Sequence, residues 1–376
     1  MNMGKEPENP FVLSGYYGRK WFCNRDKELN ELTRHIKSDR NVVLYAWRRL
    51  GKTAIIKQLF SDFEESGEYE CVYADLMVTQ SMPEATEAIT KAVFNRFGKT
   101  SSGISSSIQR LLSKVGVSLR FNEASGVPEI FFGLQRPKSE KQSFDALGDF
   151  LSNRKKRVVI ALDEFQQVTS YENVNAEVVF RNWMQEFPDI RFIYSGSHRS
   201  LMTSMFSDKS RPFYKSSQLL PLEPITEEDY REFIVNHFSE NEKTIDSATI
   251  TELYEWARGQ TYTVQRICNY LFDYYEEATV EKLQVVFDKL IDQDKPMFAS
   301  FQKMLTKVQW KVLKSIAKEE PLENPLGNEF IQKYALGASS SVQVALKSLQ
   351  KKEIVIKEGD KFLVHDVILA RWLQTL

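Results

Sequence analysis

The sequence predicts an α/β fold in which a parallel sheet carries helices on both faces, followed by a small helical domain and a winged-helix domain. Short apolar runs alternate with amphipathic helical segments over residues 1–225, which is the pattern of a covered parallel sheet. Residues 226–300 show helical periodicity alone. Residues 301–376 show three helical segments and then two strand-like segments, which is the order of a winged helix.

The first domain is expected to hold five buried strands rich in β-branched and aromatic residues. They are expected over residues 41–46, 69–76, 157–165, 190–197 and 217–225. Helices are expected over residues 25–36, 53–66, 81–99 and 143–156, with Asn24 as the N-cap of the first. Within residues 100–140, a Ser-rich cap, a short helix and two strand-like runs predict an inserted helix and hairpin.

The other two domains follow from helical periodicity and capping signals. Four helices are expected over residues 226–238, 247–259, 263–278 and 280–293. Thr306 and Gln309 have the spacing of a capping box at the start of a helix over residues 307–319. Further helices are expected over residues 327–336 and 339–352, and two strands around a turn at Gly359 are expected to finish the chain.

The composition argues against several classes of protein. The chain has 376 residues and a formal net charge of −1, so no whole-chain field favours nucleic acid or an anionic membrane. The three cysteines form no C-x-x-C pair and the four histidines are scattered, which argues against a disulfide framework and a zinc site. No secretory signal and no run of about 18 apolar residues is found. The expected location is the cytoplasm, with no membrane partner.

The stretch VVLYAWRRLGKTAII, residues 42–56, has the pattern of a phosphate-binding loop between a strand and a helix. The pattern is G-x-x-x-x-G-K-[ST], and Ala46 stands at its first glycine. Gly51 would let the backbone approach the phosphates, Lys52 would bind the β and γ phosphates, and Thr53 would bind Mg²⁺. The stretch therefore predicts ATP and Mg²⁺ as ligands of Ala46, Trp47, Arg48, Arg49, Leu50, Gly51, Lys52, Thr53 and Ala54.

Ala46 is expected to tune this loop and not to abolish binding. Alanine tolerates most backbone regions except those with positive φ, and a misfit would cost on the order of 1 kcal/mol. Losing Lys52 would remove a direct phosphate contact and cost far more. Arg48 and Arg49 either reach phosphates or pair with acidic groups, and the sequence leaves both alternatives open.

The segment VVIALDEFQQV, residues 158–168, supplies the expected second half of the site. Asp163 is predicted to hold Mg²⁺, and Glu164 is predicted to polarise the attacking water as a general base. Gln166 and Gln167 either orient water or lie at the surface.

Two further segments are candidates for contact with the γ-phosphate. Ser195 and Ser197 end a strand where open α/β sheets bind ligands, and the alternative is that they shape a tight exit from the strand. Arg211 and Lys215 in SDKSRPFYK are candidates for the extra cation that phosphoryl transfer needs, in cis or in trans. The alternative is that both are solvated basic residues in a loop.

The ordered segments WFCNRDKEL, AWRRLGKT, IALDEFQQV, FIYSGSH, RPFYK and GQTYTVQ resemble the archaeal-type ATPase family, a branch of the P-loop NTPases near the AAA+ and STAND groups. The resemblance covers essentially the whole chain. It implies an ATP-binding α/β domain, a helical lid and a C-terminal winged helix, and it places Phe22 and Arg25 beside the adenine. The family usually shows GPRRxGKT, from which Ala46 and Trp47 depart.

These observations lead to one function and one alternative. The chain is expected to be a Mg²⁺-dependent ATPase, with slow turnover, whose ATP state sets the position of the lid and the winged helix. The catalytic candidates are Glu164, Lys52, Ser197 and Arg211. The alternative is a nucleotide-gated binding module that does not hydrolyse ATP and acts on DNA or a protein; a scaffold with a vestigial site is the third interpretation.

The winged-helix domain is a candidate for DNA binding. Residues 301–376 carry 12 Lys and Arg against 8 Asp and Glu. Lys347, Lys351 and Lys352 cluster at the end of the presumed recognition helix, which suits phosphate contacts but also suits the helix dipole alone. DNA, a protein and an intramolecular lid contact are the alternatives, and the chain is also a candidate homo-oligomer.

Overall fold

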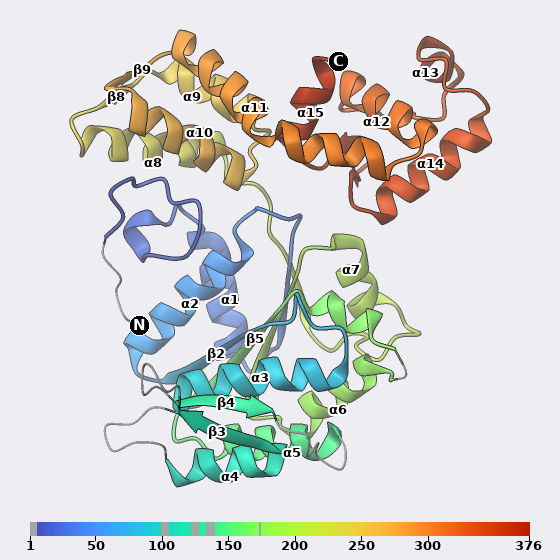
Figure 1. Ribbon diagram of the computed structural model, residues 1–376. Coiled ribbons are helices and arrows are strands. Elements are labelled where there is room, and N and C mark those ends of the chain that lie inside the picture. Colours follow the sequence, from blue (N-terminus) through green and yellow to red (C-terminus); the bar gives the residue numbers. More distant parts are fainter. Residues whose placement is uncertain (1–5, 99–104, 122–127, 133–139, 173) are drawn as a thin grey trace. The chain divides into compact units, whose positions relative to one another are not determined.

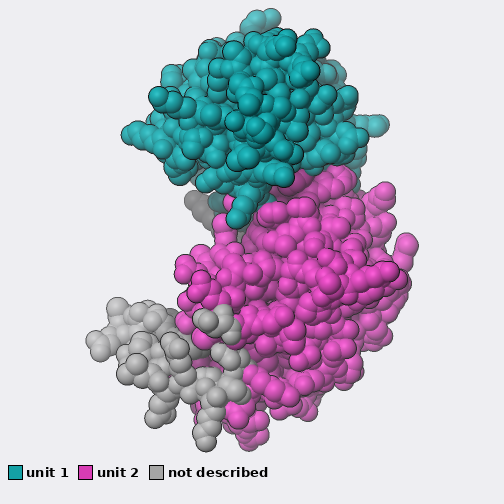
Figure 2. All heavy atoms as spheres, turned by 90° about the vertical axis from the view of Figure 1, so that its right-hand side faces the viewer, with its two compact units in different colours: residues 1–24, 224–376 teal, residues 25–223 magenta. Residues whose placement is uncertain are grey.

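The computed structural model describes residues 6–98, 105–121, 128–132, 140–172 and 174–376. The chain forms two compact units (Figure 2). Arg25–Glu223 make up the first, termed here the sheet unit. Residues 1–24 and Pro224–Leu376 make up the second, termed the helical unit. The first 24 residues thus belong with the C-terminal part of the chain, and the units divide next to residue 225.

Five parallel strands form the sheet of the sheet unit, as the alternating pattern predicts (Figure 1). They are β1 Val42–Tyr45, β2 Tyr69–Asp75, β5 Arg157–Asp163, β6 Ile190–Gly196 and β7 Gln218–Pro221. Their order across the sheet is β2-β5-β6-β1-β7. Because all five run in one direction, the residues that follow β1, β5 and β6 share one edge, where open α/β sheets bind ligands.

Amphipathic helices pack against this sheet. They are α1 Asp26–Lys37, α2 Lys52–Ser66, α3 Met82–Phe97, α5 Glu140–Ser152, α6 Ala176–Glu186 and α7 Arg199–Ser207. Leu29, Leu32 and Ile36, which repeat at helical spacing, are the buried residues of α1. The helices α6 and α7 are additional to those expected from the sequence.

The predicted N-cap of α1 is wrong. Arg25 is the N-cap residue, and no side chain caps this helix end. Asn24 and Arg25 both have positive φ, 48° and 71°, so the chain makes a left-handed turn before the helix and Asn24 lies one residue outside the capping position.

The insertion contains the predicted helix and hairpin in the parts of residues 100–140 that the structure describes. Helix α4 spans Ser106–Val115, and Ser105 caps it by accepting a hydrogen bond from the N–H of Ile108. Strands β3 Val117–Phe121 and β4 Pro128–Phe132 pair antiparallel. Residues 99–104, 122–127 and 133–139 lie outside the described residues.

Four helices come first in the C-terminal part of the helical unit, Pro224–Leu376. They are α8 Glu227–Ser239, α9 Ser247–Trp256, α10 Thr261–Tyr274 and α11 Val280–Met304. Two short strands, β8 Thr244–Ile245 and β9 Glu277–Ala278, pair in parallel between them, and strands of two residues are too short to leave a periodic pattern. The N-terminal segment joins this unit through Phe11, which is buried against Phe233, Phe238 and Phe272.

The winged-helix part shows the predicted order with one addition. It contains α12 Lys307–Glu319, α13 Asn328–Lys333, α14 Ser339–Lys351, β10 Val355–Glu358 and β11 Lys361–Val364. The capping box of Thr306 and Gln309 is present. A further helix, α15 Val367–Gln374, follows the hairpin where strand was expected. Asp366 caps α15, and most of its residues are buried, so its apolar run resembles a buried strand.

Within the helical unit, the predicted boundary at residue 300 falls inside one continuous helix. Helix α11 runs through this position and contains Pro296. Arg258, which follows α9, pairs with Glu320 at 3.2 Å, and Arg371 of α15 donates to the carbonyl oxygen of Trp256 at 2.9 Å. None of the helices in the described ranges combines the length and the hydropathy that a membrane span requires.

Candidate nucleotide site

The loop between β1 and α2 has the backbone form of a phosphate cradle. Strand β1 ends at Tyr45 and α2 begins at Lys52, so a short loop connects a buried strand to a helix N-terminus. Gly51 is the N-cap residue, has a φ of 91° and provides no side-chain cap. A helix N-terminus preceded by such a glycine is the arrangement that binds phosphate oxygens through backbone N–H groups.

Lys52 lies across this loop. Its ammonium group donates to the carbonyl oxygens of Ala46 and Trp47, both at 3.3 Å, and only 6% of the residue is exposed. The side chain therefore folds over the loop that is expected to surround the phosphates.

Ala46 fits the loop without strain. The positive φ angles of the loop occur at Arg49 (68°) and Gly51 (91°), and not at Ala46. Ala46 is fully buried, and its N–H donates to the carbonyl oxygen of Gly196 in β6 at 3.3 Å. Alanine is disfavoured against glycine where φ is positive, so this departure from the glycine pattern carries no such penalty.

Thr53 and Asp163 bring the two halves of the site into direct contact. The Thr53 hydroxyl donates to Oδ2 of Asp163 at 2.9 Å, and the Tyr73 hydroxyl of β2 donates to the same oxygen at 2.5 Å. Burial raises the pKa of Tyr73, and the charge of Asp163 raises it further, so the phenol remains protonated and acts as a donor. Hydroxyl and carboxylate oxygens are the ligands that Mg²⁺ prefers.

Asp75 is a further carboxylate at this edge of the sheet. Strands β2 and β5 pair in a register that sets Asp75 beside Asp163. Partial burial raises the pKa of Asp75, and the charges of Asp163 and Glu164 add to the rise, while the N–H of Met77 opposes it by donating at 2.8 Å. Several negative groups thus gather where a bound cation would be favoured.

Glu164 is held by two side-chain donors. The Ser197 hydroxyl donates to Oε2 of Glu164 at 2.6 Å, and Nε2 of Gln166 donates to the same oxygen at 2.5 Å. Nε of Arg48 donates to the Ser197 hydroxyl at 3.4 Å. A chain of contacts therefore runs from the phosphate-binding loop, through the residue after β6, to Glu164. The Ser195 hydroxyl, in contrast, is buried and has no partner among the described residues.

Arg25 donates a hydrogen bond to the backbone of the phosphate-binding loop. It is 5% exposed, and its guanidinium donates to the carbonyl oxygens of Leu50 at 3.2 Å and Glu223 at 2.6 Å. Phe22 belongs to the helical unit, where its ring lies edge-on to Tyr16. Their predicted place beside the adenine stays a prediction.

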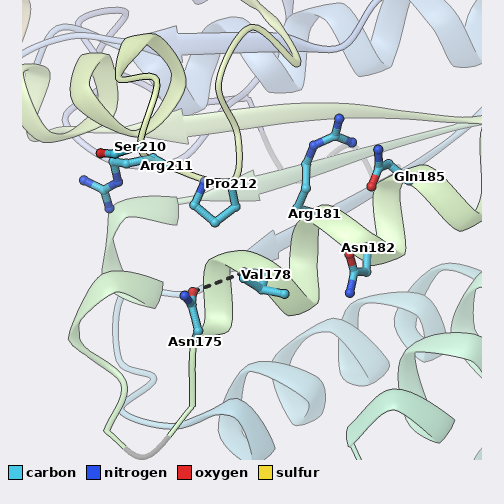
Figure 3. A pocket seen from close by; sticks show the side chains of 8 residues that line it. All are labelled: Asn175, Val178, Arg181, Asn182, Gln185, Ser210, Arg211 and Pro212. Carbon is cyan, nitrogen blue, oxygen red and sulfur yellow. Dashed lines mark hydrogen bonds between the residues drawn. The ribbon is translucent and has the colours of Figure 1, made fainter.

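Arg211 is engaged with a carboxylate of α6. Its guanidinium pairs with Glu177 through two hydrogen bonds, one of them from Nε to Oε2 at 3.1 Å. Arg211 also lines a hollow of about 530 Å³ beside α6 (Figure 3). The lining residues are Asn175, Val178, Arg181, Asn182, Gln185, Ser210, Arg211 and Pro212. No residue of the phosphate-binding loop is among them, and the hydrogen bonds of the Arg211 guanidinium go to Glu177 and Ser204.

Sequence reasoning missed Tyr73 and Asp75. Both lie in the last three residues of β2, whose neighbour in the sheet is the strand that ends at Asp163. The polar residues at the end of the expected strand 69–76 could have indicated that this strand end belongs to the site. The residues of a strand do not, however, indicate which other strand lies beside it in the sheet.

Two family profiles match the chain. Residues 22–267 match the ATPase domain predominantly from Archaea, which spans more than half of the sequence. Residues 296–375 match a family described as a probable winged helix domain. A comparison with curated proteins returned no match.

Solved structures share the fold over nearly the whole chain. A Walker-type ATPase of Pyrococcus abyssi matches with a TM-score of 0.70 and 15% identity, over 97% of this chain and 99% of its own. The ORC2 protein of Aeropyrum pernix, solved as ADPNP and ADP complexes, matches with a TM-score of 0.57 and 14% identity, over 93% and 92%. The ORC1 protein of Aeropyrum pernix, solved in complex with DNA, matches with a TM-score of 0.54 and 15% identity, over 98% and 96%.

Proposed function

The chain belongs to the family of ATPase domains found predominantly in Archaea, and we propose that it binds ATP with Mg²⁺ and hydrolyses the ATP to ADP and phosphate. The observation that carries this proposal is the 2.9 Å hydrogen bond between the Thr53 hydroxyl and Asp163. It joins the phosphate-binding loop to the acidic end of β5, although 110 positions separate the two residues. The ORC2 protein of similar fold was solved with ADPNP and ADP, which supports an adenine nucleotide as the ligand.

The residues have distinct roles in this proposal. The backbone after Gly51 and the ammonium of Lys52 bind the phosphates and offset their negative charge. Glu164 accepts a proton from a water that attacks the γ-phosphorus in line, while the bond to the β–γ bridging oxygen breaks and ADP leaves. Ser197 orients Glu164 through the 2.6 Å hydrogen bond.

The residues present fit a magnesium ion. Thr53 and Asp163 would hold it, because a hydroxyl and a carboxylate in contact supply hard oxygen ligands. The nearby charge of Asp75 increases the attraction for a cation. When bound, Mg²⁺ neutralises charge on the β and γ phosphates.

The test compares Mg²⁺-dependent phosphate release by the full chain with that of two variants. Lys52→Ala should weaken ATP binding, measured by calorimetry. Glu164→Gln should retain ATP binding and lose on the order of 100-fold in kcat, because it removes the general base. Exposed residues of the sheet unit supply matched controls, Lys91→Ala and Glu172→Gln, which should behave as wild type. Equal phosphate release by all five proteins would contradict the proposal.

Hydrolysis is proposed to set the position of the helical unit. The chain divides at Pro224, so a change in the sheet unit can be expressed as a movement of the other unit. The measurement is the distance between one fluorophore on each unit, with ADP and with an ATP analogue. Identical distances in both states would rule out the switch and leave the hydrolysis proposal untouched.

Nucleic-acid binding by the helical unit is the second candidate function. Residues 295–318 contain six lysines and no Asp or Glu. Helix α14 exposes Lys347 and Lys351 and carries no acidic residue. The ORC1 protein of similar fold was solved in complex with DNA, which supports DNA as the polyanion.

Salt dependence tests this second function. Binding of a fluorescent duplex should weaken as salt rises, and the double variant Lys347→Ala/Lys351→Ala should reduce the slope of log K against log salt by about 2. Lys91→Ala in the sheet unit is the control. No binding at low salt would exclude DNA as the partner.

A further inference from the structure

Gln166 lies next to Glu164, and only part of its amide group is hydrogen-bonded within the part of the chain that the structure describes. Its Nε2 lies 2.5 Å from Oε2 of Glu164 and 3.4 Å from the Ser197 hydroxyl. Its amide oxygen is buried and has no hydrogen-bond partner among the described residues. A buried acceptor without a partner destabilises a fold, and an apolar side chain would avoid this loss. Packing alone therefore does not account for an amide at this position.

Gly196 provides the space for that amide. A Cβ atom built on Gly196 would lie 2.4 Å from Oε1 of Gln166 and 2.5 Å from the sulfur of Met202. Both distances are shorter than van der Waals contact, so any side chain at this position would push the Gln166 amide and the Met202 side chain away. The glycine between the two serines of FIYSGSH is thus explained by the approach of Gln166 and Met202 and not by the conformation of the strand.

Side-chain donors, and not the backbone alone, orient the Glu164 carboxylate. Glu164 has left-handed dihedral angles, φ 52° and ψ 40°, at the start of the 3₁₀ helix Phe165–Ser170. The structure fixes the carboxylate through donors that converge on one oxygen, from Ser197 and from Gln166. Because a carboxylate is planar, fixing one oxygen also restricts the direction of the other.

The two donors are not equivalent. The Ser197 hydroxyl has a single proton, which it donates to Glu164. The amide nitrogen of Gln166 has two, and it reaches both Glu164 and the oxygen of Ser197. Gln166 therefore ties the carboxylate and the serine together.

We propose that Gln166 is a positioning residue that fixes the Glu164 carboxylate as the base for the water that attacks the γ-phosphate, and that Gly196 leaves the space that Gln166 needs. The inference rests on the proposed ATPase function. A base held in one direction needs little reorganisation in the transition state, so losing the support slows the chemical step. Substrate affinity, which depends on the phosphate-binding loop, is unaffected.

The experiment measures kcat and KM for ATP with the full chain. Gln166→Ala should lower kcat on the order of 10- to 100-fold and leave KM unchanged. Gln167→Ala is the matched control, since among the described residues the Gln167 side chain forms no hydrogen bond with Glu164 or Ser197, and it should retain the wild-type kcat. A wild-type kcat for Gln166→Ala overturns the inference.

A second variant tests the link to Gly196. Gly196→Ala should lower kcat in the same way, because its methyl group displaces the amide. Combining it with Gln166→Ala should lower kcat no further, since the amide is already gone. Additive losses overturn the proposed role of Gly196. If Gly196→Ala does not fold, the Gln166→Ala comparison decides alone.

The inference and the function fail in different ways. Absence of phosphate release by the wild type contradicts the proposed function, and the inference falls with it. An active wild type with an equally active Gln166→Ala variant contradicts the inference alone.

Discussion

The nucleotide site of the sheet unit and the interior of the helical unit hold carboxylates with opposite kinds of partner. In the sheet unit, the side-chain partners of Asp163 and Glu164 are hydroxyl and amide groups. In the helical unit, Glu320 is paired with the guanidinium of Arg258 at 3.2 Å, and only 3% of its side chain is exposed.

The kind of partner distinguishes a carboxylate of the nucleotide site from one that stabilises the fold. A carboxylate held by neutral donors keeps its charge for a cation or a proton, as a nucleotide site requires. A carboxylate buried against an arginine has its charge cancelled and holds two elements together. Glu320 also accepts a hydrogen bond from the N–H of Val364 at 2.9 Å, so it joins the segment before α13 to β11 and to the end of α9.

The largest expected effect is the loss of unfolding free energy when Glu320 is removed. Glu320→Ala should destabilise the helical unit by about 3–5 kcal/mol, because it removes a buried carboxylate that pairs with the partly exposed Arg258 and accepts from the N–H of Val364. Chemical denaturation measures the free energy of unfolding. The neighbouring Glu319→Ala is the control, since Glu319 pairs with Lys333 near the surface and should cost about 1 kcal/mol or less. Equal losses of unfolding free energy in both variants would show that the buried Glu320 contributes no more than a carboxylate near the surface.

The corresponding change in the sheet unit should affect activity and not stability. Asp163→Asn should keep the fold and lower kcat/KM on the order of 100-fold, because it removes the negative charge beside Thr53. Phosphate release and thermal unfolding are measured on the same protein. Asp75→Asn, at the same register of the neighbouring strand, should lose less. A strongly destabilised Asp163→Asn variant would show that this carboxylate is structural.

A third, smaller effect concerns His237 of the helical unit. Its Nε2 donates to the carbonyl oxygen of Lys20 at 3.2 Å, while its Nδ1 is buried without a partner among the described residues. Burial lowers the pKa of His237, so the unfolded chain takes up a proton first as the pH falls through about 6.5. The stability present above that pH should therefore decline below it.

The measurement is the free energy of unfolding of the helical unit between about pH 7.5 and pH 5.5. One proton gives a slope of at most about 1.4 kcal/mol per pH unit. His237→Phe, which keeps an aromatic ring beside Phe11 and Phe233, should reduce this slope. An unchanged slope would assign the pH dependence to other groups.

The smallest expected effect is that of restoring the glycine of the phosphate-binding loop. Ala46→Gly should change kcat by less than about twofold, because position 46 does not adopt the left-handed conformation that favours glycine. Steady-state kinetics with ATP check this. A large gain would show that the methyl group of Ala46 restricts the loop during turnover.

Local patterns predicted the elements well. The five strands, the inserted helix and hairpin, and the capping box at Thr306 all follow from periodicity and short-range spacing. Two expectations failed for local reasons. Asn24 lies one residue too early to cap α1. The apolar run of α15 predicts a strand, because its residues are buried almost all round and the helical period is lost.

The sequence by itself determined the phosphate-binding loop, the acidic pair Asp163 and Glu164, and the helical and winged-helix segments, because each depends on neighbours within a few residues. Only the tertiary structure decided which side chains meet. Strand order brings Tyr73 to Asp163, and the end of β6 brings Ser197 and Gly196 to Glu164 and Gln166. Tertiary packing also pairs Arg211 with Glu177, a partner that neither alternative from the sequence, a phosphate contact or a solvated loop residue, had named. Contacts between distant segments depend on how strands are ordered and helices packed, and no local pattern encodes that order.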